Sequence, residues 1–167
     1  MPVATTVDFE SVWRTKPDAP IYDLGDASAV AIVRKLLREA RTNHEPVRIV
    51  TGDDQDELYE QLATDVSATA SATDMAVIYV GEDAKAVDSP LYKAIRGSKA
   101  AGASINVAKP VGPAPSHYLL VGDDSFRLVS DPASPVAVSY WNNESVGQTL
   151  EKQFKDLQRK THAVSET

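Results

Sequence analysis

The sequence has 167 residues, of which 43% are hydrophobic and 25% charged, values that suit one globular domain and exclude a disordered chain. Its formal net charge of −7 at pH 7 opposes binding to a phosphate backbone, so nucleic acid is disfavoured as a partner. The absence of cysteine excludes disulfides, thiolate metal sites and thiol nucleophiles, and no apolar run approaches the roughly 20 residues of a membrane helix.

The beginning of the chain has neither the basic start nor the apolar stretch of a signal peptide, which predicts a cytoplasmic protein with no membrane partner. Residues 1–19 are mostly polar and are expected to form an N-terminal arm packed on the domain. That single domain is expected to span residues 20–160. Residues 161–167 are expected to be a frayed tail.

Strands and helices are expected to alternate through the first part of the domain. Asp54 and Glu57 have the spacing of a capping box, and Ser89 with Pro90 has the pattern of an N-cap followed by the first helical residue. The expected strands span residues 47–51, 75–80 and 104–107, and the expected helices span residues 27–41, 54–66 and 89–102. Such alternation is typical of a parallel sheet with helices on its faces.

The pattern changes after residue 116. Three strand candidates follow one another without a helix between them, over residues 117–121, 125–129 and 136–140. Asp123 and Asp124 form a turn-like link between the first two. A last helix is expected to begin near residues 142–143 and to bury one face. We therefore predict an α/β fold with a mixed sheet flanked by helices.

Residues 117–124 read His-Tyr-Leu-Leu-Val-Gly-Asp-Asp. This segment resembles the signature of the phospholipase D superfamily, which is a histidine, any residue, a lysine, four residues and an aspartate. The histidine falls on His117 and the aspartate on Asp124, whereas the lysine position holds Leu119. The strands and closing helix that follow also resemble one repeat of that family. The resemblance implies a single phospholipase D-like repeat.

The same resemblance implies a set of site residues. Ser134 lies roughly where the family has an asparagine, and Glu144 lies where the family has an acidic residue just before the helix. The candidate catalytic residues are therefore His117, Asp124, Ser134 and Glu144. In the family, the imidazole attacks a phosphodiester and forms a phosphohistidine, a covalent mechanism that requires no cofactor or metal.

Leu119 argues against inheriting that chemistry. Side chains two residues apart on a strand point the same way, so His117 shares its face with Leu119 where the family pairs histidine with lysine. An apolar side chain cannot stabilise the negative charge that develops on a phosphoryl group. The family also uses two copies of the motif, and this chain has one. A complete site is therefore expected only across a homodimer.

We interpret the chain as a catalytically degenerate phospholipase D-like domain that serves as a binding or interaction module, as a homodimer. Its partner would be an unidentified protein or a small molecule held near His117, Leu119, Ser134 and Glu144. In a purely structural role, the ring of His117 would bond to a backbone carbonyl or to Glu144.

Two alternatives remain open. The first is a phosphodiesterase or nuclease that uses His117 as nucleophile in a site shared across a dimer. Its cation would come from elsewhere, with Lys109 the nearest candidate in the sequence. The second is a flavodoxin-like small-molecule binder that uses Asp53 and Asp54 in the loop after Val50. Neither alternative predicts a metal or another cofactor.

Overall fold

The computed structural model describes residues 21–23, 26–98, 103–109, 115–130 and 136–164. The expected arm of residues 1–19 and the candidate residue Ser134 lie outside the described residues. None of the helices in the described ranges is long and apolar enough to cross a membrane.

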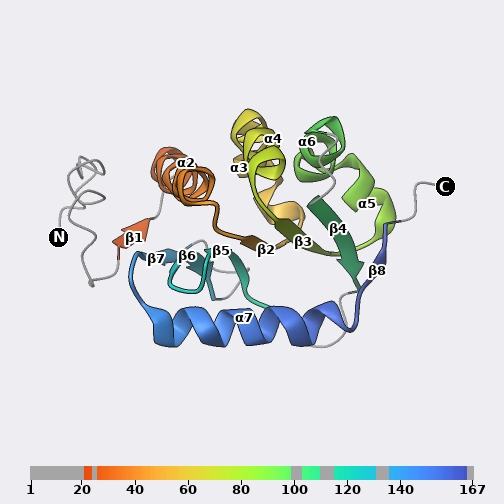
Figure 1. Ribbon diagram of the computed structural model, residues 1–167. Helices are drawn as coiled ribbons and strands as arrows, with labels where there is room; N and C mark the ends of the chain where they lie inside the picture. The colour runs from red at the N-terminus through yellow and green to blue at the C-terminus, as the bar shows by residue number, and fades with distance from the viewer. Residues whose placement is uncertain (1–20, 24–25, 99–102, 110–114, 131–135, 165–167) are drawn as a thin grey trace.

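A mixed sheet forms the centre of the described structure (Figure 1). Its strands are β1 (Ile21–Asp23), β2 (Val47–Thr51), β3 (Met75–Val80), β4 (Ala103–Ala108), β5 (His117–Val121), β6 (Ser125–Val129), β7 (Ala137–Tyr140) and β8 (His162–Ala163). They lie in the order β1-β7-β6-β5-β2-β3-β4-β8. The pairs β2–β3 and β3–β4 are parallel, and every other neighbouring pair is antiparallel. The predicted mixed sheet is confirmed, and its antiparallel half differs from a flavodoxin-like parallel sheet.

Helices cover both faces of this sheet (Figure 1). They are α2 (Asp26–Asn43), α3 (Asp56–Gln61), α4 (Ala63–Ala72), α5 (Asp83–Asp88), α6 (Pro90–Ser98) and α7 (Glu144–Gln158), with a 3₁₀ turn, η1 (Asp53–Gln55), before α3. The helices α2, α3, α4 and α6 lie on one face, and α7 crosses the other. The domain therefore has three layers, with the sheet in the middle.

Strand β5 belongs to two hydrophobic cores because its side chains alternate between the faces. Leu119 and Val121 pack in the core beneath α2, α3 and α4. Tyr118 and Leu120 pack in the core beneath α7, and the Tyr118 hydroxyl donates a hydrogen bond to the backbone oxygen of Leu150 at 3.0 Å. All five residues of β5 are buried, as expected for a strand covered on both sides.

The helix cap predicted at Ser89 is present, and Asn143 caps the last helix. The backbone N–H of Tyr92 donates to Ser89 Oγ at 3.2 Å, and that of Val146 donates to Asn143 Oδ1 at 3.1 Å. The capping box predicted at Asp54 is wrong, because α3 begins at Asp56 and its N-cap makes no side-chain hydrogen bond. The side chain of Asp54 has a different partner, described below.

The structure adds elements that the periodicity did not predict. Strand β1 pairs with β7, α5 precedes α6, and the helix expected over residues 54–66 is divided at Leu62. Residues 162–163, predicted to lie in a frayed tail, instead form β8 and pair with β4. A pairing of two residues is too short to leave a periodic signal in the sequence.

Candidate functional site

His117 is the first residue of β5, and the pairing of β5 with β2 decides its surroundings. The two strands are antiparallel, with Tyr118 opposite Val50, so His117 lies beside the carboxyl end of β2. The segment that leaves β2 there is Gly52 followed by η1. His117 is 5% exposed and faces this segment.

The imidazole of His117 is held by Asp54 from η1. Its Nδ1 lies 3.1 Å from Oδ1 and 3.2 Å from Oδ2 of the carboxylate. A carboxylate only accepts hydrogen bonds, so Nδ1 carries the proton and donates it. The other ring nitrogen, Nε2, then has its lone pair available whenever the ring is neutral. A histidine oriented by an acid in this way can act as a nucleophile or a base.

The pKa of Asp54 reflects this contact. Burial by itself raises the pKa of the carboxyl, but hydrogen bonds from His117 and Gln55 outweigh burial and hold the pKa below its ordinary value. Asp54 therefore stays ionised, which the orientation of the imidazole requires.

Gly52 allows η1 to approach His117 closely. A Cβ at this position would lie 3.1 Å from Cε1 of His117 and 3.3 Å from the backbone oxygen of Val80. The backbone of Gly52 is extended, so the requirement for glycine is steric and not conformational. The glycine that ends β2 thus makes room for the histidine of β5.

A second polar residue of η1 links the histidine to a cation. Gln55 Nε2 donates to Asp54 Oδ2 at 3.1 Å, and Gln55 Oε1 accepts from Arg127 Nη1 at 3.5 Å. Arg127 lies on β6, directly opposite Leu119, and is 8% exposed. Sequence reasoning missed Arg127. Its signal was a charged residue in the middle of the apolar strand Ser-Phe-Arg-Leu-Val.

The space beside His117 is small. A cavity with a free volume of about 10 Å³ is lined by His117, Leu119, Arg127, Gln55 and Tyr59. Burial raises the pKa of Tyr59 above its ordinary value, so this phenol stays protonated. The walls thus combine one imidazole, one guanidinium, one amide and one phenol around a space of about one water molecule.

The other candidate residues lie elsewhere. Asp124 is in the turn after β5, and the backbone N–H of Asn143 donates to the Asp124 oxygen at 2.9 Å, which places Glu144 at that same end. With five residues in β5, this end is roughly 13 Å from His117. Glu144, one of the two partners considered for a structural His117, therefore does not bond to it. Asp54 takes that place, because β5 runs antiparallel to β2 and brings its first residue to η1.

Lys109, considered as a substitute cation, follows β4. Strands β2 and β3 separate β4 from β5, so three strand spacings, about 14 Å, lie between Lys109 and His117. In the part of the chain that the structure describes, the cation that lines the cavity beside His117 is Arg127.

The acidic residues of the loop after Val50 have separate environments. Asp53 pairs with Lys85 at 2.9 Å, with both side chains largely exposed. Burial, together with the charges of Asp53 and Asp54, raises the pKa of Asp56 to about 6. Asp54 contacts His117, so the loop proposed for a flavodoxin-like binder and the histidine of the phospholipase D-like motif belong to one site.

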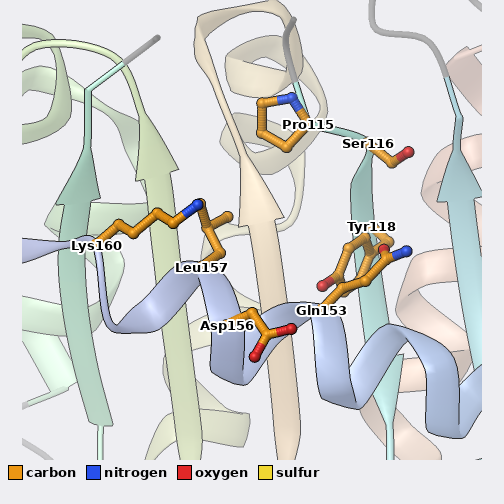
Figure 2. Close-up of a pocket in the computed structure, with 7 residues that line it drawn as sticks. All are labelled: Pro115, Ser116, Tyr118, Gln153, Asp156, Leu157 and Lys160. Carbon is orange, nitrogen blue, oxygen red and sulfur yellow. The ribbon is translucent and has the colours of Figure 1, made fainter. Parts of the chain in front are cut away.

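A larger cavity lies on the opposite face of the sheet (Figure 2). It has a volume of about 390 Å³ and lies between the start of β5 and the second half of α7. Its polar lining includes Ser116, Gln153, Asp156 and Lys160. Figure 2 shows Gln153 next to Tyr118 and Lys160 beyond Leu157. This cavity contains neither His117 nor Arg127, so it is separate from the histidine site.

Known proteins resemble this chain in structure and not in sequence. No family model and no curated protein matches the sequence. TrmBL2, an archaeal chromatin protein, superposes with a TM-score of 0.66 at 13% identity, over 93% of this chain and 59% of TrmBL2. NucT from Helicobacter pylori gives a TM-score of 0.59 at 8% identity, over 87% of this chain and 98% of NucT. Nuc from Salmonella typhimurium, a phospholipase D family member, gives a TM-score of 0.52 at 12% identity, over 87% of this chain and 98% of Nuc.

These likenesses establish a class of fold. The chain has a phospholipase D-like α/β fold, as the segment 117–124 predicted. The superposition covers 98% of Nuc and 98% of NucT, so the likeness extends over nearly the whole of both proteins. At these identities the fold is what is shared, and the activity of this chain has to be argued from its own residues.

Proposed function

We propose that this chain is a catalytically degenerate phospholipase D-like domain that serves as a binding or interaction module. One observation carries the proposal: Leu119, at the lysine position of the motif, is 2% exposed and packs in the apolar core beneath α2 and α3. A side chain so placed offers no charge to a phosphoryl group and fills the space that a lysine would use.

The size of the cavity supports the same proposal. A phosphodiester that reacts with His117 has to reach Nε2, and the free volume there is about 10 Å³. That volume suits one water molecule. Hydrolysis would require a rearrangement of these walls.

The fold also occurs outside enzymes. TrmBL2 is a chromatin protein that binds DNA, so a phospholipase D-like fold does not by itself imply catalysis. The net charge of −7 opposes DNA binding by this chain. A protein or a small molecule is the partner that this charge favours.

Hydrolysis of bis(p-nitrophenyl) phosphate tests the proposal on the wild type, His117→Ala and Leu119→Lys. We expect the wild type and His117→Ala to show the same background rate. Hydrolysis by the wild type that disappears in His117→Ala would overturn the proposal. Activity gained only in Leu119→Lys would support it, because the site would then be shown to lack the lysine of the family motif.

A phosphodiesterase or nuclease is the second candidate, and the contact between His117 and Asp54 favours it. An acid that holds Nδ1 leaves Nε2 in the correct tautomer for nucleophilic attack. In this case Asp54→Asn should lower the rate about as strongly as His117→Ala, since both residues act as one unit. Equal background rates in the wild type, Asp54→Asn and His117→Ala would argue against a phosphodiesterase or nuclease.

We further propose a homodimer that pairs around the histidine strands. The support is the single copy of residues 117–124 and the correspondence of the fold to one repeat. A second copy of the chain would supply the second histidine that the family arrangement contains.

A further inference from the structure

We propose that the cavity between β5 and α7 binds a zwitterionic amino acid with an apolar side chain, whose carboxylate pairs with Lys160 and whose ammonium group pairs with Asp156. The inference goes beyond the proposed function, because this cavity lies on the other face of the sheet from the histidine site and is not lined by His117.

One face of α7 forms the polar wall of the cavity. Gln153, Asp156 and Leu157 are three and four residues apart, so their side chains project from the same side of the helix. Lys160 follows the helix, and its backbone N–H donates to the oxygen of Leu157 at 2.9 Å. Figure 2 shows the Lys160 side chain extended toward Leu157 and Asp156 below Leu157. A cation and an anion thus reach the same cavity.

These two charges do not neutralise each other. No ion pair joins Asp156 to Lys160, although they are four residues apart. Asp156 Oδ1 instead accepts a hydrogen bond from Arg159 Nη1 at 3.0 Å, which leaves Oδ2 to accept from a ligand. Within the part of the chain that the structure describes, Lys160 forms no ion pair. A dipolar ligand would satisfy both groups at once.

The wall opposite α7 is apolar. Pro115, just before β5, and the side chain of Tyr118 on β5 line it. Tyr118 is 5% exposed, and its hydroxyl donates to the backbone oxygen of Leu150 at 3.0 Å, which fixes the position of the ring. Burial and the charge of Glu151 raise the pKa of Tyr118, so the phenol stays protonated and adds no charge. This wall offers apolar contact to the side chain of a ligand.

The size and the charges of the cavity together match an amino acid. Its volume of about 390 Å³ lies at the lower end of the roughly 300–1,000 Å³ of small-molecule sites, which favours a small ligand. An ammonium group donates charge-assisted hydrogen bonds to a carboxylate, and this pairing can occur twice, at Lys160 and at Asp156. A ligand with a single charge would pair with one of these residues and leave the other without a partner.

Calorimetric titration of the full chain with three compounds tests the inference. L-phenylalanine carries both charges, 3-phenylpropionate lacks the ammonium group, and phenethylamine lacks the carboxylate. We expect L-phenylalanine to bind the wild type at least about threefold more tightly than either analogue, because each analogue loses one charged contact at a partly exposed site.

Two variants assign each charge to its group on the ligand. Lys160→Met should weaken the binding of L-phenylalanine and 3-phenylpropionate several-fold and should not weaken that of phenethylamine. Asp156→Asn should weaken the binding of L-phenylalanine and phenethylamine and should not weaken that of 3-phenylpropionate. Both side chains are exposed, so both variants are expected to fold.

Lys152→Met is the matched control. Lys152 is exposed on α7 and does not line the cavity, so its loss removes the same charge from the same helix and should leave all three affinities unchanged. Equal losses of affinity in Lys152→Met and Lys160→Met would assign the effect to net charge and overturn the inference.

Failure of L-phenylalanine to bind the wild type, or tighter binding of either analogue, would also overturn the inference. None of these results bears on the phosphodiesterase assay, which reports on the separate site at His117. The failure of this inference and the failure of the proposed function are therefore distinguishable.

Discussion

At the scale of the residue, His117 depends on partners that come from other parts of the chain. Asp54 lies 63 positions earlier in the sequence and holds Nδ1, and Gly52 makes the approach possible. Arg127 reaches the same cavity from β6. A buried histidine with an ionised partner on one nitrogen has a fixed orientation, which is the property that both catalysis and ligand binding require.

The contact of His117 with Asp54 predicts a pH-dependent contribution to stability. The pKa of Asp54 is lowered in the folded protein, so the unfolded chain binds the proton more tightly. The stabilisation is therefore complete above the ordinary pKa of 3.8 and is lost as the pH falls through the lower folded value. We expect Asp54→Asn to lower the free energy of unfolding by about 1 kcal/mol at pH 7.

Urea unfolding of the wild type and Asp54→Asn between pH 7 and about pH 3 measures this difference. It should be constant near neutrality and shrink below about pH 4. Asp88→Asn is the control, because the Asp88 side chain is 86% exposed and forms only a surface pair with Lys93. A difference that grows as the pH falls would contradict the assignment of Asp54 as the ionised partner.

At the scale of the element, the start of α7 packs against the turn between β5 and β6. The backbone N–H of Asn143, just before α7, donates to the Asp124 oxygen, and Ser125 Oγ donates to the Trp141 oxygen. Gly147, in the first turns of α7, is buried against the backbone of Asp123. The motif turn thus has a structural role, since it supports the helix that covers one face of the sheet.

The packing of α7 predicts a large effect of a small substitution. A Cβ at Gly147 would overlap the backbone oxygen of Asp123, so Gly147→Ala has to push α7 away from the turn. We expect a loss of about 2–4 kcal/mol in the free energy of unfolding. Thermal or urea unfolding measures it.

Gly97→Ala is the matched control for this prediction. Gly97 is also in a helix, α6, but a Cβ there meets no atom within 4 Å. Alanine is the better helix former, so this variant should gain up to about 0.5–1 kcal/mol. Similar losses in both variants would show that glycine matters in these helices for a reason other than contact with the turn.

The elements themselves were largely predictable from the sequence. The strands of residues 75–80 and 117–121, the cap at Ser89 and the start of the last helix near residues 142–143 follow from local patterns, and the structure confirms them. The capping box at Asp54 failed because a short polar side chain can bond either to its own helix or to a distant group. Here the distant group, His117, is the partner.

At the scale of the whole molecule, the proposed homodimer predicts the mass in solution. Light scattering of the full chain should give about twice the chain mass of 18.0 kDa. Since each copy carries a net charge of −7, added salt should strengthen the association by screening repulsion. A mass of one chain at all salt and protein concentrations would contradict the dimer.

The sequence by itself determined most of the strands and helices, the mixed character of the sheet and the phospholipase D-like fold, because hydrophobic periodicity and a short motif are local properties. Only the tertiary structure decided which residues meet at His117. Candidate residues Asp124 and Glu144 lie at the far end of β5, whereas Asp54, 63 positions away in the sequence, and Arg127 on the neighbouring strand reach the histidine site. Strand order and register determine these contacts. Both depend on packing between segments that are distant in the sequence, which no local pattern records.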